Sequence, residues 1–386
     1  LIVQKNKPEI RFTKFKNDWV HQSLNKVVER VIRKNKNNES KVPLTISAQY
    51  GLVDQVTYFN KQIASTDLSN YFLLQKGDFA YNKSYSKDYP WGAIKRLDKY
   101  EEGVLSSLYI VFKPTRVHSD FLVPYYETSR WYKEVSMRAT EGARNHGLLN
   151  ISAVDFLETE LSIPVDFEEQ MKIGNFFRDL DETISLHQQE LEAFKQTKQG
   201  FLQKMFPKDG ETEPAVRFEK YTENWQLKKL GDILKVNSGR DYKHLGTGNI
   251  PVYGTGGFML NVNESLSNED AIGLGRKGTI DKPQLLKAPF WTVDTLFFMT
   301  MKKDIDLHFC YSLINMISWK KYDESTGVPS LSKTNIDKIL VKVPSYEEQL
   351  KIGEFFRQLD EVIELKEKEL ETLKETKKGF LQKMFV

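Results

Sequence analysis

The sequence has very little cysteine and histidine, and it has no long hydrophobic run. Of its 386 residues, one is a cysteine, Cys310, and six are histidines. A single cysteine excludes an internal disulfide framework and fits a reducing compartment. No apolar stretch approaches the roughly 20 residues that a membrane-spanning helix needs, and the first twenty residues lack the apolar core of a signal peptide. We therefore expect a cytoplasmic protein with no membrane partner, in which Cys310 is buried and unreactive.

The motifs of common catalytic sites are also missing. The sequence contains no GxxxxGKS or GxxxxGKT loop, no HExxH, no pair of CxxC motifs and no Asn-Pro-Pro-aromatic motif for adenine methylation. The stretch GLGRKG at 273–278 matches GxGxxG, but Pro283 follows where a dinucleotide-binding fold needs a helix. We therefore expect no catalytic residue, no metal and no bound cofactor in this chain.

One segment of the sequence occurs twice. Residues 168–206 align without a gap to residues 347–385, with 27 of 39 positions identical, and both copies end in GFLQKMF. Apolar residues recur at alternating steps of four and three in each copy, which predicts a heptad seam on a long helix. The seam includes Phe177, Leu180, Ile184 and Leu191 in the first copy and Phe356, Leu359, Ile363 and Leu370 in the second.

Each copy begins with a helix start signal. The pairs Asp166 with Glu169 and Ser345 with Glu348 predict capping boxes, in which the glutamate bonds back to the backbone of the N-cap residue. A helix this long cannot bury its apolar stripe alone, so we expect the two copies to pair antiparallel. The alternative is that each helix packs on its own domain as an ordinary core helix. Four polar residues lie on the seam, and we interpret them as packing their stems while their heads reach solvent; these are His187, Lys198, Lys366 and Lys377.

The second half of the chain begins as the first half does. RFTKFKNDW at 11–19 matches RFEKYTENW at 217–225, after Pro207 and a polar linker have ended the first helix. Short strand-like runs separated by Gly, Asn, Asp and Ser follow in both halves. We predict an α+β protein with two mixed α/β domains and a pair of long antiparallel coiled-coil helices in a pseudo-twofold internal repeat. The predicted segments are a domain at 1–163, a helix at 164–207, a domain at 208–343 and a helix at 344–386.

The charge balance permits a nucleic-acid partner but does not require one, because 56 Lys and Arg residues oppose 53 Asp and Glu residues. The turn with Arg276 and Lys277 is suited to phosphate oxygens or to the acceptor edge of guanine, although solvated loop cations are an equal alternative. The DNA-binding candidates are polar or basic residues in turns: Asn82, Lys83, Ser84, Arg138, Arg144, Asn145, His146, Ser238, Arg240, Tyr253, Thr255, Arg276, Lys277 and Lys333. Trp91, Trp131 and Trp291 are interpreted as core or interface anchors.

Several motifs carry a resemblance to a known family. The repeated EEQxKIGxFFRxLDExI and KGFLQKMF, together with IPVYGTGG, GLGRKGTI, APFWTVDTLFF and GVPSLSKTNIDKILVKVP, resemble the specificity subunit of type I restriction-modification enzymes. The resemblance implies a non-catalytic DNA-binding subunit with two target recognition domains, one for each half of a bipartite target. It also implies that the long helices set the gap between half-sites and dock two methyltransferase subunits. Two restriction subunits complete such an enzyme, and S-adenosylmethionine, ATP and magnesium belong to the partner subunits.

Two other classes of protein remain open from the sequence. A free-standing enzyme would need a catalytic domain, for which the duplicated architecture leaves no residues. An autonomous DNA-binding regulator or a coiled-coil scaffold without restriction partners is harder to exclude from pattern alone. Copurification discriminates between them, because a regulator should purify as a homo-oligomer and a specificity subunit with methyltransferase subunits at two copies to one.

Overall fold

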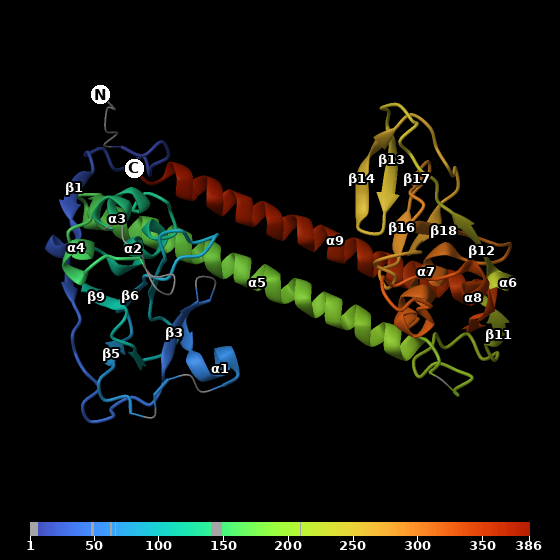
Figure 1. Cartoon of the computed structure of the whole chain (residues 1–386), viewed down its shortest axis with the longest axis horizontal. Helices are drawn as coiled ribbons and strands as arrows, with labels where there is room; N and C mark the ends of the chain where they lie inside the picture. Colours follow the sequence, from blue (N-terminus) through green and yellow to red (C-terminus); the bar gives the residue numbers. More distant parts are fainter. Residues whose placement is uncertain (1–6, 48–49, 62–63, 66, 140–148, 209) are drawn as a thin grey trace. The chain divides into compact units, whose positions relative to one another are not determined.

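The chain divides into two compact units, each with part of both long helices. The computed structural model describes residues 7–47, 50–61, 64–65, 67–139, 149–208 and 210–386. Unit 1 consists of Leu1–Leu186 with Leu370–Val386, and unit 2 consists of His187–Glu369. The long helices are α5 (Phe167–Met205) and α9 (Tyr346–Lys383), and both contribute residues to both units (Figure 1).

The domain of unit 1 is built on a four-stranded antiparallel sheet. Its strand order is β2 (Val28–Arg30), β9 (Ile110–Pro114), β6 (Phe79–Asn82) and β7 (Ala93–Arg96). Two-stranded ladders join β1 (Val20–Ser23) to β10 (Glu160–Ile163), β3 (Leu44–Ser47) to β4 (Gly51–Asp54), and β5 (Phe72–Gln75) to β8 (Glu102–Leu105). The short helices are α1 (Gln55–Phe59), α2 (Ser119–Tyr125), α3 (Tyr132–Arg138) and α4 (Ala153–Leu157), with a 3-10 turn η1 at Leu24–Lys26.

The domain of unit 2 repeats this plan. Its four-stranded antiparallel sheet has the order β12 (Leu234–Ser238), β18 (Leu296–Met301), β15 (Ala271–Gly275) and β16 (Gln284–Leu286). A second sheet has the order β14 (Gly257–Val262), β13 (Ile250–Gly254) and β17 (Trp291–Thr292), and β11 (Gln226–Lys229) pairs with β19 (Leu340–Val343). The remaining elements are α6 (Leu230–Ile233), α7 (Leu307–Met316), η2 (Trp319–Tyr322) and α8 (Lys333–Lys338). The large sheets of the two units therefore connect equivalent strands in the same order, which agrees with an internal repeat.

The duplicated GFLQKMF segment packs into the cores of the domains. In unit 1, Met384 and Phe385 at the end of α9 are buried in the same cluster as Phe177 at the start of α5. In unit 2, Met205 and Phe206 at the end of α5 are buried with Phe356 at the start of α9. Each domain core thus contains the start of one long helix and the end of the other. The same intramolecular packing in both units explains why these seven residues occur twice in the sequence.

The two long helices pair antiparallel within each unit, as the sequence predicted. Lys377 of α9 binds Asp181 of α5 in unit 1, and the repeat-equivalent pair Lys198 and Asp360 makes the same contact in unit 2. Burial alone would lower the pKa of the Lys377 ammonium, but Glu127 and Asp181, with oxygens at 2.6 Å and 2.5 Å, raise it above its ordinary value. These lysine heads are therefore bound by carboxylates, whereas the sequence interpretation placed them in solvent.

The predicted seam residues line this pairing. Phe177, Ile184, Leu191, Phe356 and Leu370 are buried, while Leu180, Leu359 and Ile363 are half-buried. The layer next to the unit boundary is polar, because Lys366 lies 3.3 Å from Glu190 on the opposite helix and 3.1 Å from Glu369 on its own helix.

The glutamate half of each predicted capping box is wrong, because each glutamate accepts bonds from an arginine and not from the start of its helix. This difference shows how each domain is attached to the helix that follows it. Glu348 is almost fully buried and accepts two 2.8 Å bonds from Arg217, instead of bonding back to the helix start. In unit 1 Glu169 accepts two bonds from Arg11 at 2.6 Å and 2.7 Å. A bidentate bond from a charged guanidinium is stronger than a bond from a neutral backbone N–H, so the arginine takes the carboxylate. We refer to these two ion pairs as the arginine clamps.

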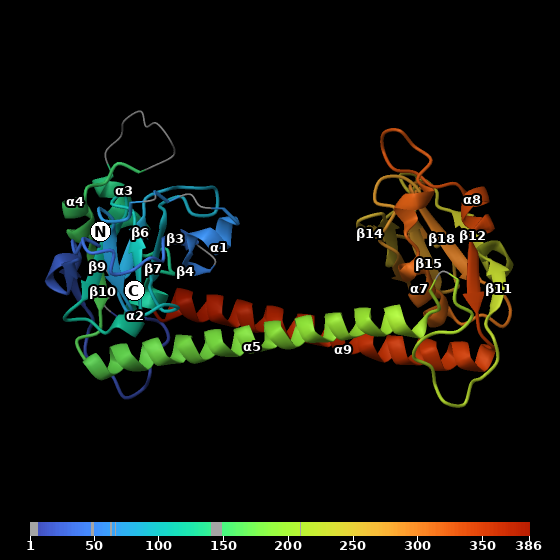
Figure 2. The same ribbon diagram turned by 90° about the horizontal axis from the view of Figure 1, so that it is seen from below.

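A glycine one to two helical turns after the glutamate of each clamp allows a short helix of the domain to pack closely against the long helix. A Cβ at Gly174 would lie 2.5 Å from the Cβ of Asp120 at the start of α2, which lies over the start of α5 (Figure 2). A Cβ at Gly353 would lie 2.1 Å from Oδ1 of Asp306, which caps α7. The repeated motif EEQxKIGxFF is therefore explained largely by the contacts between each domain and the helix that follows it.

Candidate nucleic-acid interface

The candidate residues of unit 2 come together around residues 292–295, from the end of β17 to the start of β18. The backbone N–H of Arg240, just after β12, donates to Thr292 O at 2.8 Å. On the neighbouring strand, Tyr253 O accepts from the N–H of Val293 at 3.0 Å. The N–H of Arg276, just after β15, donates to Thr295 O at 2.8 Å. Three chain segments that are far apart in sequence therefore present polar side chains at the same edge of the domain.

Glycines permit the close approaches on which this edge depends. A Cβ at Gly239, between Ser238 and Arg240, would lie 2.0 Å from Val293 O. A Cβ at Gly275, the last residue of β15, would lie 1.9 Å from Thr279 O, and Gly278 has a φ of +94°. The glycines of GLGRKG thus form a tight basic turn after a strand, which agrees with rejecting the dinucleotide-binding interpretation.

The segment before α8 lies along the basic turn. The N–H of Leu331 donates to Arg276 O at 2.9 Å, and the N–H of Gly278 donates to Pro329 O at 2.8 Å. This pairing places Lys333, the first residue of α8, two positions beyond the residue that bonds Arg276. The GVPSLSK stretch is therefore a backbone support for the turn as well as the source of another lysine.

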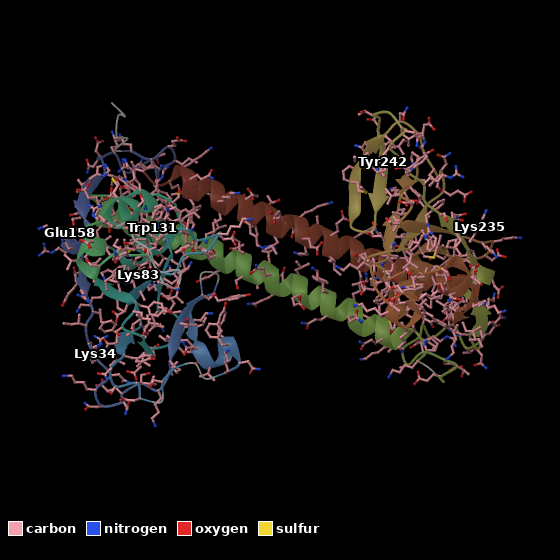
Figure 3. All side chains as sticks on the ribbon, in the orientation of Figure 1. Lys34, Lys83, Trp131, Glu158, Lys235 and Tyr242 are labelled. Atoms are coloured by element: carbon pink, nitrogen blue, oxygen red, sulfur yellow. The ribbon has the colours of Figure 1, made fainter. Side chains whose placement is uncertain are left out.

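The side chains at this edge are available to a ligand. Ser238, Arg240, Arg276 and Lys277 are exposed, whereas Tyr253, Thr255 and Lys333 are half-buried. The Arg276 guanidinium donates to Asp294 O at 3.3 Å and lies 5.9 Å from the ring of Phe297. These contacts orient the planar guanidinium and use one of its five N–H donors, and the others remain at the surface, which suits phosphate oxygens or the O6 and N7 acceptors of guanine. Tyr242, two residues after Arg240, anchors the same segment against the core of the second sheet (Figure 3).

Unit 1 has a corresponding basic turn. Lys83 O accepts from the N–H of Leu149 at 2.9 Å, which is the counterpart of the bond between Arg276 and Leu331 (Lys83 is labelled in Figure 3). Asn82 at the end of β6 accepts from the N–H of Ser84 at 3.0 Å, so its side chain shapes the turn. Ser84 is exposed, whereas Asn82 and Lys83 are half-buried.

The other predicted residues of unit 1 are not all part of this turn. Arg138 at the end of α3 donates to Glu134 at 2.6 Å, and Glu134 also accepts from the N–H of Glu160 at 3.0 Å. Arg138 therefore has an intramolecular partner that joins α3 to β10. Three candidates, Arg144, Asn145 and His146, lie outside the described residues.

Sequence reasoning missed two exposed apolar residues beside the basic edge of unit 2. Phe258 and Met259 lie on β14, and the Phe258 ring is 6.4 Å from that of Tyr253. Strict strand alternation would expose only one of two consecutive residues, so no alternating pattern could have revealed the pair. By contrast, Trp131 and Trp291 are buried and Trp91 packs against the core of unit 1, in agreement with their interpretation as anchors.

The described residues contain no cluster of three or more His, Cys, Asp or Glu side chains that could hold a metal ion. No helix among them combines the length and the apolar composition that a membrane span needs. Burial raises the pKa of the Cys310 thiol to about 12, so the thiolate that would act as a nucleophile is not formed near neutral pH.

Comparisons with known proteins agree with the resemblance. Residues 222–375 match the family model for the type I restriction modification DNA specificity domain. The chain is 23% identical over 322 residues to the type I restriction enzyme MjaVIII specificity subunit of Methanocaldococcus jannaschii, with 73% of each chain covered. The structure matches the type I restriction-modification S subunit from M. genitalium with a TM-score of 0.67 and 17% identity over 98% of this chain and 99% of that one.

A second solved structure has the same fold. It comes from work on complex assembly and conformational transition of the type I R-M system, and it matches with a TM-score of 0.54 and 13% identity over 96% of this chain and 98% of that one. The predicted α+β fold with two domains and paired long helices is therefore confirmed. The chain is similar along its length to the S subunits of type I restriction-modification systems, and its residues 222–375 match the family model of the type I restriction modification DNA specificity domain.

Proposed function

We propose that the chain is the DNA-reading, non-catalytic specificity subunit of a type I restriction-modification enzyme, acting in the cytoplasm. Each of its two domains reads one half of a bipartite, asymmetric target. The observation that carries this proposal is that the two domains of the chain have the same framework but different turns. The two domains share one sheet order and one mode of attachment to the helices, but they differ at the turns that carry Lys83 in one and Arg276 in the other. A shared framework with different loops is what two readers of different sequences require.

The long helices set the distance between the two half-sites in this proposal. Helix α5 has 39 residues, which corresponds to about 58 Å at 1.5 Å per residue. Both ends of each helix pack into domain cores, so neither end can slide along its domain without exposing buried aromatic residues such as Phe206 or Phe385. The number of residues in the helix therefore sets the distance between the half-sites in this proposal.

The partners are two copies of a methyltransferase subunit, joined by two restriction subunits. Support comes from exposed residues that are identical in both helices but are not needed for internal packing. Leu186 and Leu365 occupy equivalent positions, and both are 57% exposed. A surface leucine retained at the same place in both halves fits a docking site that binds the same partner twice. S-adenosylmethionine is assigned to the methyltransferase subunits, and ATP and magnesium are assigned to the restriction subunits.

Copurification and methylome sequencing test the proposal together. Coexpressed with the host methyltransferase subunit, the chain should form a complex with two methyltransferase copies, measured by native mass spectrometry. Methylation should fall on adenines in a bipartite target with an unread gap. A homo-oligomer that binds a palindromic site without a methyltransferase would instead support an autonomous regulator.

Matched substitutions test the docking residues. The double variant Leu186→Asp and Leu365→Asp should lose the methyltransferase subunits. Leu227→Asp is the control, because Leu227 is also exposed but is replaced by His21 at the corresponding position of the first half. Equal retention of the methyltransferase by both variants would place the docking site elsewhere.

A further inference from the structure

The hairpin of the second sheet in unit 2 exposes two consecutive apolar side chains. Phe258 is 59% exposed and Met259 is 48% exposed. The register pairs Tyr253 with Phe258 and Val252 with Leu260, so Met259 is the extra residue of a β-bulge on β14. Bulges re-aim side chains and are frequent next to functional sites. Here the bulge leaves both apolar residues at the surface beside the tip of the hairpin.

Unit 1 carries an exposed aromatic pair at the corresponding hairpin, with Tyr50 directly before β4 and Tyr58 on α1, the helix that follows β4. Strands β3 and β4 follow β2 in the chain as β13 and β14 follow β12, and each hairpin also has a parallel contact, Pro43 with Val104 in unit 1 and Val252 with Trp291 in unit 2. Tyr50 is 55% exposed, and its ring lies 6.4 Å from that of Tyr58, which is 46% exposed.

Glycine begins the second strand of both hairpins. Gly51 has a φ of +78° and Gly257 has a φ of +106°, a conformation that other residues rarely adopt. Both domains thus present exposed apolar side chains at the hairpin that follows the first strand of the large sheet. Apolar residues that are exposed by chance would not be expected at corresponding hairpins in both halves.

The hairpin of unit 2 is continuous with the basic edge described above. Tyr253, whose ring faces Phe258, is paired with Thr292, and Thr292 O accepts the backbone bond from Arg240. Apolar surface next to exposed cations suits a duplex, in which the phosphates bind the cations while base faces and thymine methyl groups contact apolar side chains.

We propose, on the basis of the proposed function, that the two hairpins, together with helix α1 in unit 1, are base-contacting elements of the two recognition domains. Phe258 and Met259 make apolar contacts with bases of one half-site, and Tyr50 with Tyr58 makes them with bases of the other. Apolar side chains of this kind stack on bases or wedge between base steps.

The internal repeat favours DNA over a protein partner at these hairpins. A surface that binds the same methyltransferase in both halves should be the same in both halves, as the helices largely are. The hairpins are different, because GLVD in β4 stands where β14 has GFMLNV. An element that reads two different half-sites is expected to differ in this way.

The test measures binding of duplexes by the complex of this chain with its methyltransferase subunit. The probe is a fluorescent duplex with the target found by methylome sequencing, and competitors have one half-site scrambled. Phe258→Ala with Met259→Ala should weaken binding of the intact target about ten- to a hundredfold, through one half-site only. Tyr50→Ala with Tyr58→Ala should do the same through the other half-site. The slope of affinity against salt should stay unchanged, because no phosphate contact is lost.

Leu340→Ala, another exposed leucine of unit 2, is the control and should bind as the unaltered chain does. Unchanged affinity of both double variants, or loss through the same half-site, would overturn the inference. If the double variants no longer bind the methyltransferase subunit, but those molecules that still carry it bind DNA with unchanged affinity, the hairpins are protein-docking surfaces. If the unaltered complex binds no bipartite target, the proposed function itself is wrong.

Discussion

Removing the arginine of one clamp should destabilise unit 2 strongly. Arg217 is 12% exposed and Glu348 is 1% exposed, and two 2.8 Å bonds join them. In Arg217→Met the apolar stem is kept, but the buried Glu348 carboxylate loses both charge-assisted bonds. Removing one partner of a buried ion pair costs about 3 to 5 kcal/mol. We expect a loss of this size in the free energy of unfolding, measured by urea denaturation with the fluorescence of Trp225, which is buried in the same core.

Two further variants make this prediction specific. Lys14→Met breaks the pair between Lys14 and Glu168, which are 55% and 43% exposed, and should cost at most about 1 kcal/mol. The double variant Arg217→Met with Glu348→Met should recover most of the loss, because no unpaired charge is then buried. A loss for Arg217→Met no larger than that for Lys14→Met would refute the reasoning that the clamp holds a buried carboxylate.

Three other predictions follow from single residues. Arg276→Ala should weaken binding through one half-site by about 5- to 150-fold if the guanidinium contacts a base edge, measured by competition between duplexes; a uniform loss with a smaller salt slope would make it a phosphate anchor. Cys310, with its pKa raised to about 12 by burial, should resist a thiol reagent at pH 8 until the protein is denatured, and reaction of the native protein would contradict its burial. Gly353→Ala should lower the urea midpoint through its clash with Asp306, whereas Gly379→Ala, with nothing within 4 Å, should not.

The long helices and their pairing were predictable because the signal is local and periodic. Steps of four and three over 39 residues specify one apolar stripe, and a second copy of the same stripe supplies its partner. The repeated GFLQKMF indicated equivalent surroundings but not their nature. Only the structure shows that Phe206 and Phe385 lie in domain cores.

The arginine clamps were not predictable from spacing. Arg11 and Glu169 are 158 residues apart, and the local capping pattern favoured a bond within the helix start instead. Periodicity describes contacts along one element, whereas the clamp joins a domain to the helix that follows it. The same limit applies to the interface, because Arg240 and Arg276 follow β12 and β15, which the strand order places on either side of β18 in one sheet.

Individual interface residues were predicted less well than the turns that carry them. A basic residue in a turn has the same appearance in sequence whether it faces a ligand or a neighbouring carboxylate. Arg138 illustrates the second case, since Glu134 binds it four residues earlier on the same helix. Phe258 and Met259 illustrate the opposite error, because apolar residues in a strand are expected to be buried and a bulge exposes them.

The most direct test of the central claim is the length of the unread gap when both helices are lengthened together. One heptad should be inserted after Gln189 in α5 and after Lys368 in α9, close to where Lys366 and Glu190 show that the helices face each other. Seven residues add about 10 Å and keep the seam in phase, which corresponds to about three base pairs at 3.4 Å each. Methylome sequencing of a strain with this variant should show both half-sites unchanged and the gap about three base pairs longer. Methylation that persists with the original gap would contradict the claim that the helices measure the distance between the half-sites.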